Sequence, residues 1–374
     1  MPTEVLRIDP EGNYRDIVQR AAEVLRAGRL LAFPTETVYG VGARADQAEA
    51  IDRLRDVKGR EITKPFTLHI GDPEHVHRYV PGLHGLTRRF VRKAWPGPLT
   101  IVFAVPDPAQ APVIQDIGTE HIPNLYYDNT IGIRCPDDAT AAAILTEAGV
   151  PVVAASANRA GGTPPRSAEG VVADLDGAVD LLVDGGPARY AKASTVVRLT
   201  DGGFEILREG VVDERMLRRY AALNVLFVCS GNTCRSPMAA VMLRAELARH
   251  LGCKPEELAA RGVTVSSAGA GSFGGSPASE GALAAMERRG LDLSDHVARA
   301  LDVDAIQQAD HVYCMTRGHR AAVVALVPQA AGKTELLGDD TEINDPFGGP
   351  HEGYEACAAE IEAALKRRLA EMMA

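Results

Sequence analysis

Residues 225–237 read Val-Leu-Phe-Val-Cys-Ser-Gly-Asn-Thr-Cys-Arg-Ser-Pro. The four apolar residues predict a short buried strand, and a helix is expected to follow, with Ser236 as its N-cap and Pro237 at its first position. A strand, a loop of small residues and a helix N-terminus form an anion cradle, because backbone N–H groups and the positive end of the helix dipole point into one concavity.

Cys229 and Arg235 stand at the two ends of this loop. The cradle should stabilise the Cys229 thiolate, which would make it a nucleophile at neutral pH. The Arg235 guanidinium can hold a phosphate through two parallel hydrogen bonds. The pattern therefore predicts phosphatase chemistry. Its plain alternative is a buried structural cysteine beside a surface arginine.

Length, charge and cysteine usage limit the possibilities for the whole chain. At 374 residues it is long for one domain, so we expect two. The formal net charge of -10 argues against nonspecific coating of nucleic acid but permits a local basic cleft. The sequence shows neither a membrane-length apolar run nor a secretory leader, which predicts a cytoplasmic protein without membrane contact. Six irregularly spaced cysteines predict no disulfide framework and no metal site.

Polar residues follow several predicted strands of the first half. A helix is expected from residue 14 to 25, followed by a buried strand at 30–33 that runs into the turn Pro-Thr-Glu-Thr-Val-Tyr-Gly-Val-Gly at 34–42. Further strands are expected at 66–70, 101–105, 130–136, 151–155, 194–197 and 206–210. Hydroxyls, amides and cations at strand ends, without a Cys or His nucleophile, favour a site that positions substrates for phosphoryl-type chemistry. The plainer alternatives are a simple turn, a core histidine at His69 and a solvated basic face at 58–64.

Residues 10–212 resemble the YrdC-type threonylcarbamoyl-adenylate synthases, which serve the threonylcarbamoyl (t6A) modification of adenosine in tRNA. The resemblance rests on the block at 34–40, on Lys58-x-Arg60 with Ser156-x-Asn158, and on Trp-Pro-Gly-Pro-Leu-Thr at 95–100. Ser194-Thr195 and Arg208 extend it. It implies an open, twisted α/β sheet with a central cleft, and L-threonine, bicarbonate and ATP as substrates.

The same resemblance implies two groups of binding residues. L-threonine would be held by Thr37, His69, Arg134 and Ser194. ATP would be held by Lys58, Arg60, Lys64, Thr130, Ser156, Asn158 and Arg208. Mg²⁺ is expected to accompany ATP, although the sequence offers no obvious carboxylate cage. The implied partners are tRNA or the transferase complex that completes the t6A modification.

The second half shows alternating strands and helices after a charged, helix-prone segment. We expect a domain at 1–212, a linker helix at 213–222 and a second domain at 223–374. Strands at 263–266, 311–315 and 335–337 alternate with helices at 237–250, 277–289 and 354–369, and Thr316 is expected to cap a further helix. This order predicts a doubly wound parallel sheet with helices on both faces.

Residues 223–374 resemble the low-molecular-weight protein tyrosine phosphatase family along their whole length. The resemblance implies that Cys229 attacks phosphorus and that Arg235 holds the phosphate oxygens. Asp345, in the Asp345-Pro346 turn, would protonate the leaving group and then activate water. Supporting roles around the phosphate fall to Asn232, Thr233 and Ser236. No cofactor is implied, and phosphorylated proteins are the substrates.

Thr233 separates two substrate hypotheses. Tyrosine-directed members usually carry an aliphatic residue at this position, whereas protein-arginine phosphatases carry threonine together with Asp-Pro-Phe-Gly-Gly, as at residues 345–349 here. A hydroxyl can accept a hydrogen bond from a guanidinium, and an isoleucine would leave that donor unpaired. Phosphoarginine is therefore the favoured substrate, with phosphotyrosine as the alternative.

Several other hypotheses stay open. Cys234 is either a packed small residue or the partner that traps an oxidised Cys229 as a reversible disulfide. An arsenate reductase on the same fold would need a resolving cysteine pair, and Cys314 has no near neighbour in sequence. The first half could be only a module that binds double-stranded RNA or tRNA through the basic segment 53–64. It could also act on carbamoyl phosphate, but the acylphosphatase and zinc-finger segments that accompany that activity are absent from the sequence.

Overall fold

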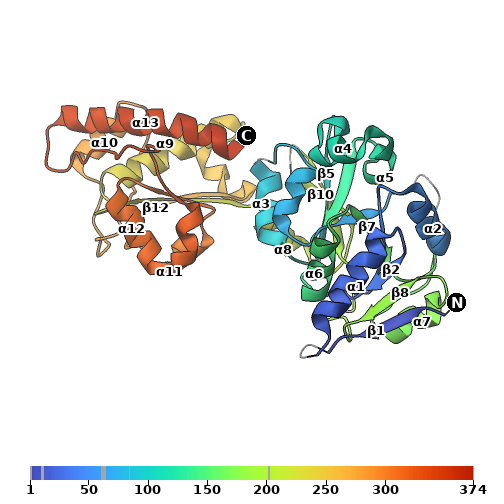
Figure 1. Ribbon diagram of the computed structural model, residues 1–374. Coiled ribbons are helices and arrows are strands. Elements are labelled where there is room, and N and C mark those ends of the chain that lie inside the picture. The colour runs from blue at the N-terminus through green and yellow to red at the C-terminus, as the bar shows by residue number, and fades with distance from the viewer. Residues whose placement is uncertain (1, 10–11, 60–64, 84, 201–202, 374) are drawn as a thin grey trace. The chain divides into compact units, whose positions relative to one another are not determined.

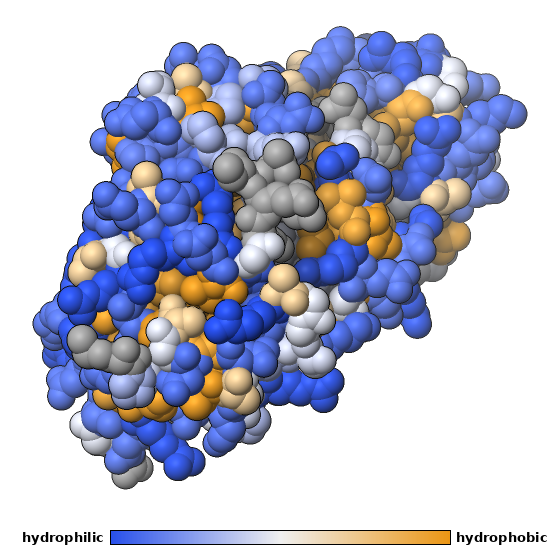
Figure 2. Space-filling model, turned by 90° about the vertical axis from the view of Figure 1, so that its right-hand side faces the viewer, coloured by the Kyte–Doolittle hydropathy of each residue, from blue (hydrophilic) through white to orange (hydrophobic). Residues whose placement is uncertain are grey.

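The computed structural model describes residues 2–9, 12–59, 65–83, 85–200 and 203–373. The chain divides into two compact units, Met1–Tyr220 and Ala221–Ala374 (Figure 1). On the face shown in Figure 2, hydrophilic residues predominate around smaller hydrophobic patches. None of the helices within the described residues is long and apolar enough to cross a membrane.

Unit 1 is built on one large mixed sheet. Within the described residues it has ten strands in the order β1-β8-β2-β3-β7-β4-β6-β5-β9-β10, paired both parallel and antiparallel. Their bounds are β1 (Glu4–Arg7), β2 (Leu31–Phe33), β3 (Gly40–Arg44), β4 (Thr67–His69), β5 (Leu99–Ala104), β6 (Thr130–Arg134), β7 (Val152–Ser156), β8 (Leu181–Asp184), β9 (Thr195–Thr200) and β10 (Gly203–Arg208). The prediction of an open α/β sheet is confirmed.

The helices of unit 1 cover this sheet. They are α1 (Tyr14–Arg26), α2 (Ala48–Lys58), α3 (Gly85–Ala94), α4 (Pro112–Ile117), α5 (Ile122–Leu125), α6 (Ala139–Ala148), α7 (Ala168–Leu175) and α8 (Glu214–Ala221). Helices α1 and α6 lie side by side (Figure 1). The apolar stripe of α1, which includes Ile17, Ala21 and Leu25, is buried with Leu31 and Phe33 of β2. The helical spacing of the sequence therefore marks the face that packs on the sheet.

The strand order brings distant segments of unit 1 together. In register, His69 of β4 lies opposite Arg134 of β6, and Arg134 lies opposite Thr100 of β5. Strand β5 also pairs with β9, which follows directly after Ser194. On the other side of β4, Ser156 at the end of β7 pairs with the start of β3. The polar strand ends noted in the sequence are thus neighbours across several strands.

Unit 2 has a parallel sheet between two helical layers. The order is β12-β11-β13-β14, with bounds β11 (Leu223–Cys229), β12 (Val263–Gly269), β13 (His311–Cys314) and β14 (Thr334–Leu336). Its helices are α9 (Arg235–His250), α10 (Glu280–Glu287), α11 (Val303–Gln308), α12 (Arg317–Leu326) and α13 (His351–Met373). Helices α9, α10 and α13 lie on one face and α11 and α12 on the other, which confirms the doubly wound prediction (Figure 1).

Strand β11 separates two hydrophobic cores. Val225 and Phe227 belong to the core beneath α9, α10 and α13. Leu226 and Val228 belong to the core beneath α11 and α12. Because successive side chains of a strand point to opposite faces, a run of apolar residues is what a strand buried on both faces requires.

Two predicted helix starts are wrong. Helix α9 begins at Arg235 with Cys234 at the N-cap, so Ser236 lies inside the helix, where its hydroxyl bonds to side chains of the loop instead of capping. Helix α10 begins at Glu280, because Ser279 caps it by accepting from the Ala282 amide. The residues predicted before it are extended, and Pro277 forms an isolated bridge with Val297. The predicted cap at Thr316 is confirmed, since its hydroxyl accepts from the His319 amide at the start of α12.

Candidate active sites

The cysteine loop is held at the carboxyl end of β11. Cys229 is the last residue of the strand, and the loop leads into α9. The neighbouring strand β12 ends at Gly269, where an added Cβ would lie 2.6 Å from the Ser230 carbonyl oxygen and 3.0 Å from the Asn232 amide nitrogen. Only glycine permits β12 to approach the loop this closely. The backbone therefore fixes where the thiol lies.

Two donors surround the Cys229 sulfur. Its Sγ lies 3.0 Å from the Ser236 hydroxyl and accepts from the Asn232 amide at 3.3 Å. The Ser236 oxygen accepts from the Asn232 side-chain amide at 2.9 Å, and its hydrogen can go to the sulfur at 3.0 Å or to the more distant Ala268 carbonyl at 3.5 Å. Cys229, Asn232 and Ser236 are all buried. The arrangement suits a thiolate, because hydrogen bonds to the charged sulfur are stronger than hydrogen bonds to a neutral thiol.

Asn232 holds the loop in its turn. Its φ of 59° lies in the left-handed region, which asparagine adopts more readily than most residues. Its side chain also donates to the Ser267 hydroxyl at 2.9 Å and accepts from the Arg299 amide at 2.9 Å. The Asn232 carbonyl lies 2.7 Å from Nε2 of His296. These contacts assign Asn232 to the support of the loop.

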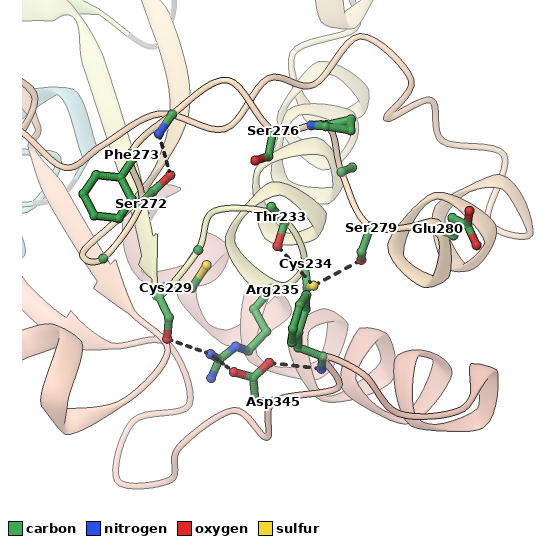
Figure 3. Close-up of a pocket in the computed structure, with 17 residues that line it drawn as sticks. Cys229, Thr233, Cys234, Arg235, Ser272, Phe273, Ser276, Ser279, Glu280 and Asp345 are labelled. Carbon is green, nitrogen blue, oxygen red and sulfur yellow. Dashed lines mark hydrogen bonds and ion pairs between the residues drawn. The ribbon is translucent and has the colours of Figure 1, made fainter.

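Arg235 and Asp345 meet beside the loop. Nη2 of Arg235 forms an ion pair with the Asp345 carboxylate and donates to the Ser230 hydroxyl at 3.3 Å. Nη1 donates to the Ile343 carbonyl at 3.3 Å. Arg235 is buried, whereas the Asp345 side chain is 47% exposed. The acidic and basic groups are thus brought together with the thiol, and the carboxylate remains accessible to an incoming substrate (Figure 3).

These residues line one cavity of about 710 Å³. Cys229, Thr233, Arg235 and Asp345 face it from the loop side, and the segment from Gly271 to Glu280 forms the opposite wall (Figure 3). Phe273 and Phe347 line the cavity and are largely exposed. Such a space holds far more than a phosphate group, so it can take the side chain that carries the phosphate as well.

Cys234 lies in the same cavity as Cys229. Its Sγ lies 3.1 Å from the Ser279 hydroxyl, 3.5 Å from the Thr233 hydroxyl and 3.9 Å from the Tyr354 hydroxyl. Burial is the main cause that raises the pKa of Tyr354, so the phenol keeps its proton. Both cysteines are free thiols in this structure.

In unit 1, Arg134 forms hydrogen bonds with two side chains of the turn that follows β2. Its Nη2 donates to the Thr37 hydroxyl at 2.6 Å and to the Glu36 carboxylate at 2.9 Å. Both partners are buried. Among the described side chains, Arg134 Nε and Glu36 Oε1 are buried without a hydrogen-bond partner. Such groups are costly unless something else pairs with them, so a ligand with polar groups fits here.

His69 is a neutral imidazole beside Arg134. Burial lowers the pKa of His69 to about 3, and the positive charge of Arg134 acts in the same direction. Its Nδ1 lies 3.0 Å from the Thr67 carbonyl, so Nδ1 carries the hydrogen and Nε2 is left as an acceptor. This nitrogen can accept a hydrogen bond from a hydroxyl or an amine of a substrate.

Ser194 connects to Thr100 and to Arg208. Its hydroxyl lies 3.1 Å from the Thr100 hydroxyl and 3.1 Å from Nη2 of Arg208. Arg208 also donates to the Ser194 carbonyl at 2.8 Å. The structure thereby joins a residue predicted for ATP to one predicted for threonine. Thr100 was missed from the sequence, although its place in register with Arg134 follows from the sheet.

Lys58, Ser156 and Asn158 form a second polar cluster. The Lys58 ammonium donates to the Ser156 carbonyl at 2.7 Å and contacts the carbonyl and the side chain of Asn158. The Ser156 hydroxyl donates to Asn158 Oδ1 at 2.5 Å. Arg60 and Lys64, which the sequence assigns to the same group, lie outside the described residues.

Thr130 lies at the opposite end of β6 from Arg134. It begins β6, four residues before Arg134, and its hydroxyl donates to the Tyr127 carbonyl at 2.7 Å. Thr130, Gly132 and Arg134 share one face of the strand, because side chains alternate. The two ends of that face are roughly 13 Å apart at the usual rise per residue. Only an elongated ligand could reach both.

No metal centre emerges from the described side chains, because they include no group of three or more His, Cys, Asp and Glu that could hold an ion.

Comparisons with known proteins divide the chain in the same way. The Sua5/YciO/YrdC family model, described as "Telomere recombination", matches residues 23–210. The model described as "Low molecular weight phosphotyrosine protein phosphatase" matches residues 224–374.

Individual relatives match one half of the chain or the other. The threonylcarbamoyl-AMP synthase of Bacillus subtilis is 34% identical over 200 residues, which are 54% of this chain and 55% of that protein, so the chain spans about half of that relative's length. The putative threonylcarbamoyl-AMP synthase of Mycobacterium tuberculosis H37Rv is 35% identical over 205 residues, 54% of this chain and 88% of that protein. The protein-arginine-phosphatase of Geobacillus stearothermophilus is 40% identical over 148 residues, 38% of this chain and 91% of that protein.

Solved structures that share the fold include a double variant of Sua5 from Pyrococcus abyssi. The match covers 89% of this chain and 97% of that chain, with a TM-score of 0.51 and 22% sequence identity.

Proposed function

The chain belongs to the Sua5/YciO/YrdC family over residues 23–210 and to the low-molecular-weight phosphotyrosine protein phosphatase family over residues 224–374, and from this we propose that it is a bifunctional enzyme. A synthase of L-threonylcarbamoyl adenylate occupies residues 1–212, a linker 213–222, and a protein-arginine phosphatase 223–374. The observation that carries the proposal is the pair of polar centres, one without a nucleophile around Arg134 and one with a supported thiol at Cys229.

In the synthase, the protein positions its substrates. Bicarbonate and the threonine amine give a carbamate with loss of water, and an oxygen of that carbamate attacks the α-phosphorus of ATP while pyrophosphate leaves. Arg134 would neutralise the threonine carboxylate, and its unpartnered Nε supports this role. The acceptor nitrogen of His69 suits the threonine hydroxyl, and Thr37 and Ser194 complete the group. The site gains its rate by aligning two anions that repel each other.

ATP would lie over the second polar cluster. Lys58, Ser156 and Asn158 surround its phosphates, together with Arg60 and Lys64, and Arg208 joins them to the threonine group. Thr130 would contact the far end of the nucleotide. The described residues include no group of side chains that could coordinate Mg²⁺, so the ion would be held mainly by the phosphates. The roles proposed for the protein's residues do not depend on it. The product would pass to tRNA or to a t6A transferase complex, and the cytoplasm is the location that we propose for this activity.

In the phosphatase, Cys229 attacks phosphorus. Ser236 and Asn232 stabilise the thiolate before attack and the leaving thiolate afterwards. Arg235 exchanges its ion pair with Asp345 for the phosphate oxygens. The freed carboxylate takes up a proton from solvent, and the resulting carboxylic acid protonates the leaving group. The same carboxylate then takes a proton from the water that hydrolyses the phosphocysteine. No cofactor takes part in this route.

Phosphoarginine is the substrate that this cavity favours. The Thr233 hydroxyl faces the cavity, and its side-chain contact among the described residues is the long one to Cys234 at 3.5 Å, so it is available to a guanidinium. The 40% identity to a protein-arginine-phosphatase, over 91% of that protein's length, supports the choice. Phosphotyrosine is the second candidate, because the exposed Phe273 and Phe347 can stack on an aromatic ring.

The decisive experiment measures both activities on the full chain and on two variants. Pyrophosphate release is followed with ATP, threonine and bicarbonate, and phosphate release with a phosphoarginine peptide. Lys58→Ala should abolish the first activity and spare the second, and Cys229→Ser should do the reverse. If the unmodified chain released no pyrophosphate that depends on threonine and bicarbonate, unit 1 would be a binding module for RNA instead.

A further inference from the structure

His319 lies beside the cysteine loop although it is far from it in sequence. Strand β13 runs parallel to β11, and the Met315 amide donates to the Val228 carbonyl at 3.0 Å, so the start of α12 lies next to the start of the loop. His319 is 8% exposed. Its Nε2 lies 2.9 Å from the hydroxyl of Ser230, the residue after the nucleophile.

The Thr316 hydroxyl is the partner of the other ring nitrogen of His319. Its oxygen accepts from the His319 amide at 3.3 Å and lies 3.0 Å from His319 Nδ1. In one tautomer Thr316 donates its hydroxyl hydrogen to Nδ1. The ring hydrogen then sits on Nε2 and is donated to Ser230.

In this tautomer Ser230 receives two hydrogen bonds. One comes from His319 Nε2 and the other from Nη2 of Arg235, at 3.3 Å. A hydroxyl oxygen has two lone pairs, so both are in use and its own hydrogen must point elsewhere. Ser230 is exposed and lines the cavity with Cys229 and Arg235. The free hydrogen is thus available to a ligand in that cavity.

The charges around His319 keep the ring neutral. Burial lowers its pKa, and the positive charge of Arg235 lowers it further. The carboxylates of Asp345 and Glu342 act in the opposite direction. Glu342 is itself held at the start of α12, where it accepts from the Arg317 amide at 2.7 Å.

We propose that His319 is a positioning residue of the phosphatase, which orients the Ser230 hydroxyl as an additional donor to the bound phosphoryl group. This inference rests on the proposed phosphatase function. Arg235 and Ser230 would then donate to different oxygens of the phosphate, and a phosphate oxygen that accepts from Ser230 favours the tautomer in which His319 donates to that hydroxyl. Donors held in place by neighbouring groups stabilise developing charge with less rearrangement.

The test measures the Kd of inorganic phosphate by calorimetry on the full chain, and kcat/KM with p-nitrophenyl phosphate. Ser230→Ala should weaken phosphate binding by about tenfold to a hundredfold, the effect of one hydrogen bond to a charged group. His319→Ala should weaken it in the same direction and by no more. His319→Gln, whose amide nitrogen can take the place of Nε2, should stay within about twofold of the unmodified chain. His250→Ala, at the exposed end of α9, is the matched control.

The double variant Ser230→Ala/His319→Ala distinguishes positioning from plain structural support. It should bind phosphate as Ser230→Ala does, to within about twofold, because His319 acts only through the hydroxyl. Two independent losses that multiply would overturn the inference, and so would unchanged binding in Ser230→Ala. In either case an unmodified chain that hydrolyses p-nitrophenyl phosphate leaves the phosphatase function standing. A chain that neither binds phosphate nor hydrolyses that ester would overturn both.

Discussion

The Asp345 carboxylate forms an ion pair with the Arg235 guanidinium in the cavity that holds the Cys229 thiol. Arg235 is also tied to the Ser230 hydroxyl and to the Ile343 carbonyl, so its side chain stays in place when one partner leaves. An arriving phosphate therefore competes with a single partner, the half-exposed Asp345. The substrate thus frees the Asp345 carboxylate, which can then take up the proton that it delivers to the leaving group.

Asp345→Asn tests this exchange. The amide cannot transfer a proton, so kcat on a phosphoarginine or phosphotyrosine peptide should fall by about 10² to 10⁴. The loss should be smaller with p-nitrophenyl phosphate, whose leaving group needs little protonation. The Kd for inorganic phosphate should fall, because Arg235 loses its competing anion. Asp340→Asn is the control, since Arg317 bonds only to the backbone carbonyl there. Unchanged turnover of the peptide would refute the role of Asp345.

Thr233→Ile tests the choice of substrate. Isoleucine removes the hydroxyl that can pair with a guanidinium, so the ratio of kcat/KM for phosphoarginine to that for phosphotyrosine peptides should fall roughly tenfold or more. Thr233→Ser keeps the hydroxyl and should keep most of the ratio. A higher phosphoarginine turnover in Thr233→Ile, or the same preference, would show that the hydroxyl does not select the substrate.

Cys234→Ser tests whether the second thiol protects the first. Mild peroxide should oxidise Cys229 to a sulfenic acid, which Cys234 then converts to a disulfide with release of water. The intact mass should fall by two hydrogens, and a reductant should restore activity. In Cys234→Ser, inactivation should become irreversible as peroxide rises. Cys253→Ser, a partly buried thiol that lines no part of this cavity, is the control. Undiminished activity of the peroxide-treated chain, without a disulfide, would exclude the mechanism.

Thr37→Val tests the threonine group of unit 1. The Thr37 hydroxyl accepts from Arg134 at 2.6 Å, and valine keeps the shape but not the acceptor. The KM for threonine should rise about tenfold, because the guanidinium loses an oriented partner, whereas the KM for ATP should stay the same. Thr200→Val, at an exposed strand position, is the matched control. A rise in the KM for ATP alone would move Thr37 into the nucleotide site.

His69→Asn tests the neutral, buried imidazole through stability. The folded pKa of about 3 lies below the ordinary value near 6.5, so between these limits the unfolded chain binds the extra proton. His69 should therefore lower the free energy of unfolding by about 1.4 kcal/mol for each unit that pH falls through this window. Asparagine keeps a donor for the Thr67 carbonyl but cannot titrate. The slope of the free energy of unfolding against pH should therefore decrease by the contribution of one proton. His77→Asn, at an exposed site, should leave it unchanged.

The measurement is possible on the full chain because of Trp95. It is the single tryptophan of the sequence, it is buried, and it belongs to unit 1. Its fluorescence therefore follows the unfolding of unit 1 alone. An equal pH slope in the parent and in His69→Asn would show that the histidine titrates alike in the folded and unfolded states.

Periodicity and composition were enough to predict the strands and the buried helix faces. Apolar runs located the strands of unit 2, and the spacing of Ile17, Ala21 and Leu25 marked the buried face of α1. The start of α9 was misplaced because Ser236 normally signals a cap, and the signal cannot show that the hydroxyl is taken by a thiol and an amide of the loop. Local propensity is a weak guide where a site uses the same groups for another purpose.

The contacts missed from the sequence join residues that only the sheet order brings together. The sequence assigns no role to Glu36, whereas in the structure its carboxylate accepts a hydrogen bond from Arg134. Thr100 and Ser194 meet because β5 lies between β6 and β9, an order that sequence spacing does not contain. His319 reaches the cysteine loop for the same reason, since β13 pairs with β11. The residue types predicted the kind of chemistry, but the hydrogen-bond partners of each group follow from the strand order of the sheets.

The position of β11 between two cores has a consequence for hydrogen exchange. Opening this strand would disrupt both cores at once, so its amides should exchange only through the rarest, most global openings of unit 2. Cys229 is anchored at the end of that strand, whereas Asp345 comes from an irregular segment with a half-exposed side chain. The nucleophile is thus fixed to the slowest-exchanging part of the unit, and the acid belongs to a part that can open locally and often. How often the thiol and the acid come together therefore depends on the local motion of the segment that carries Asp345.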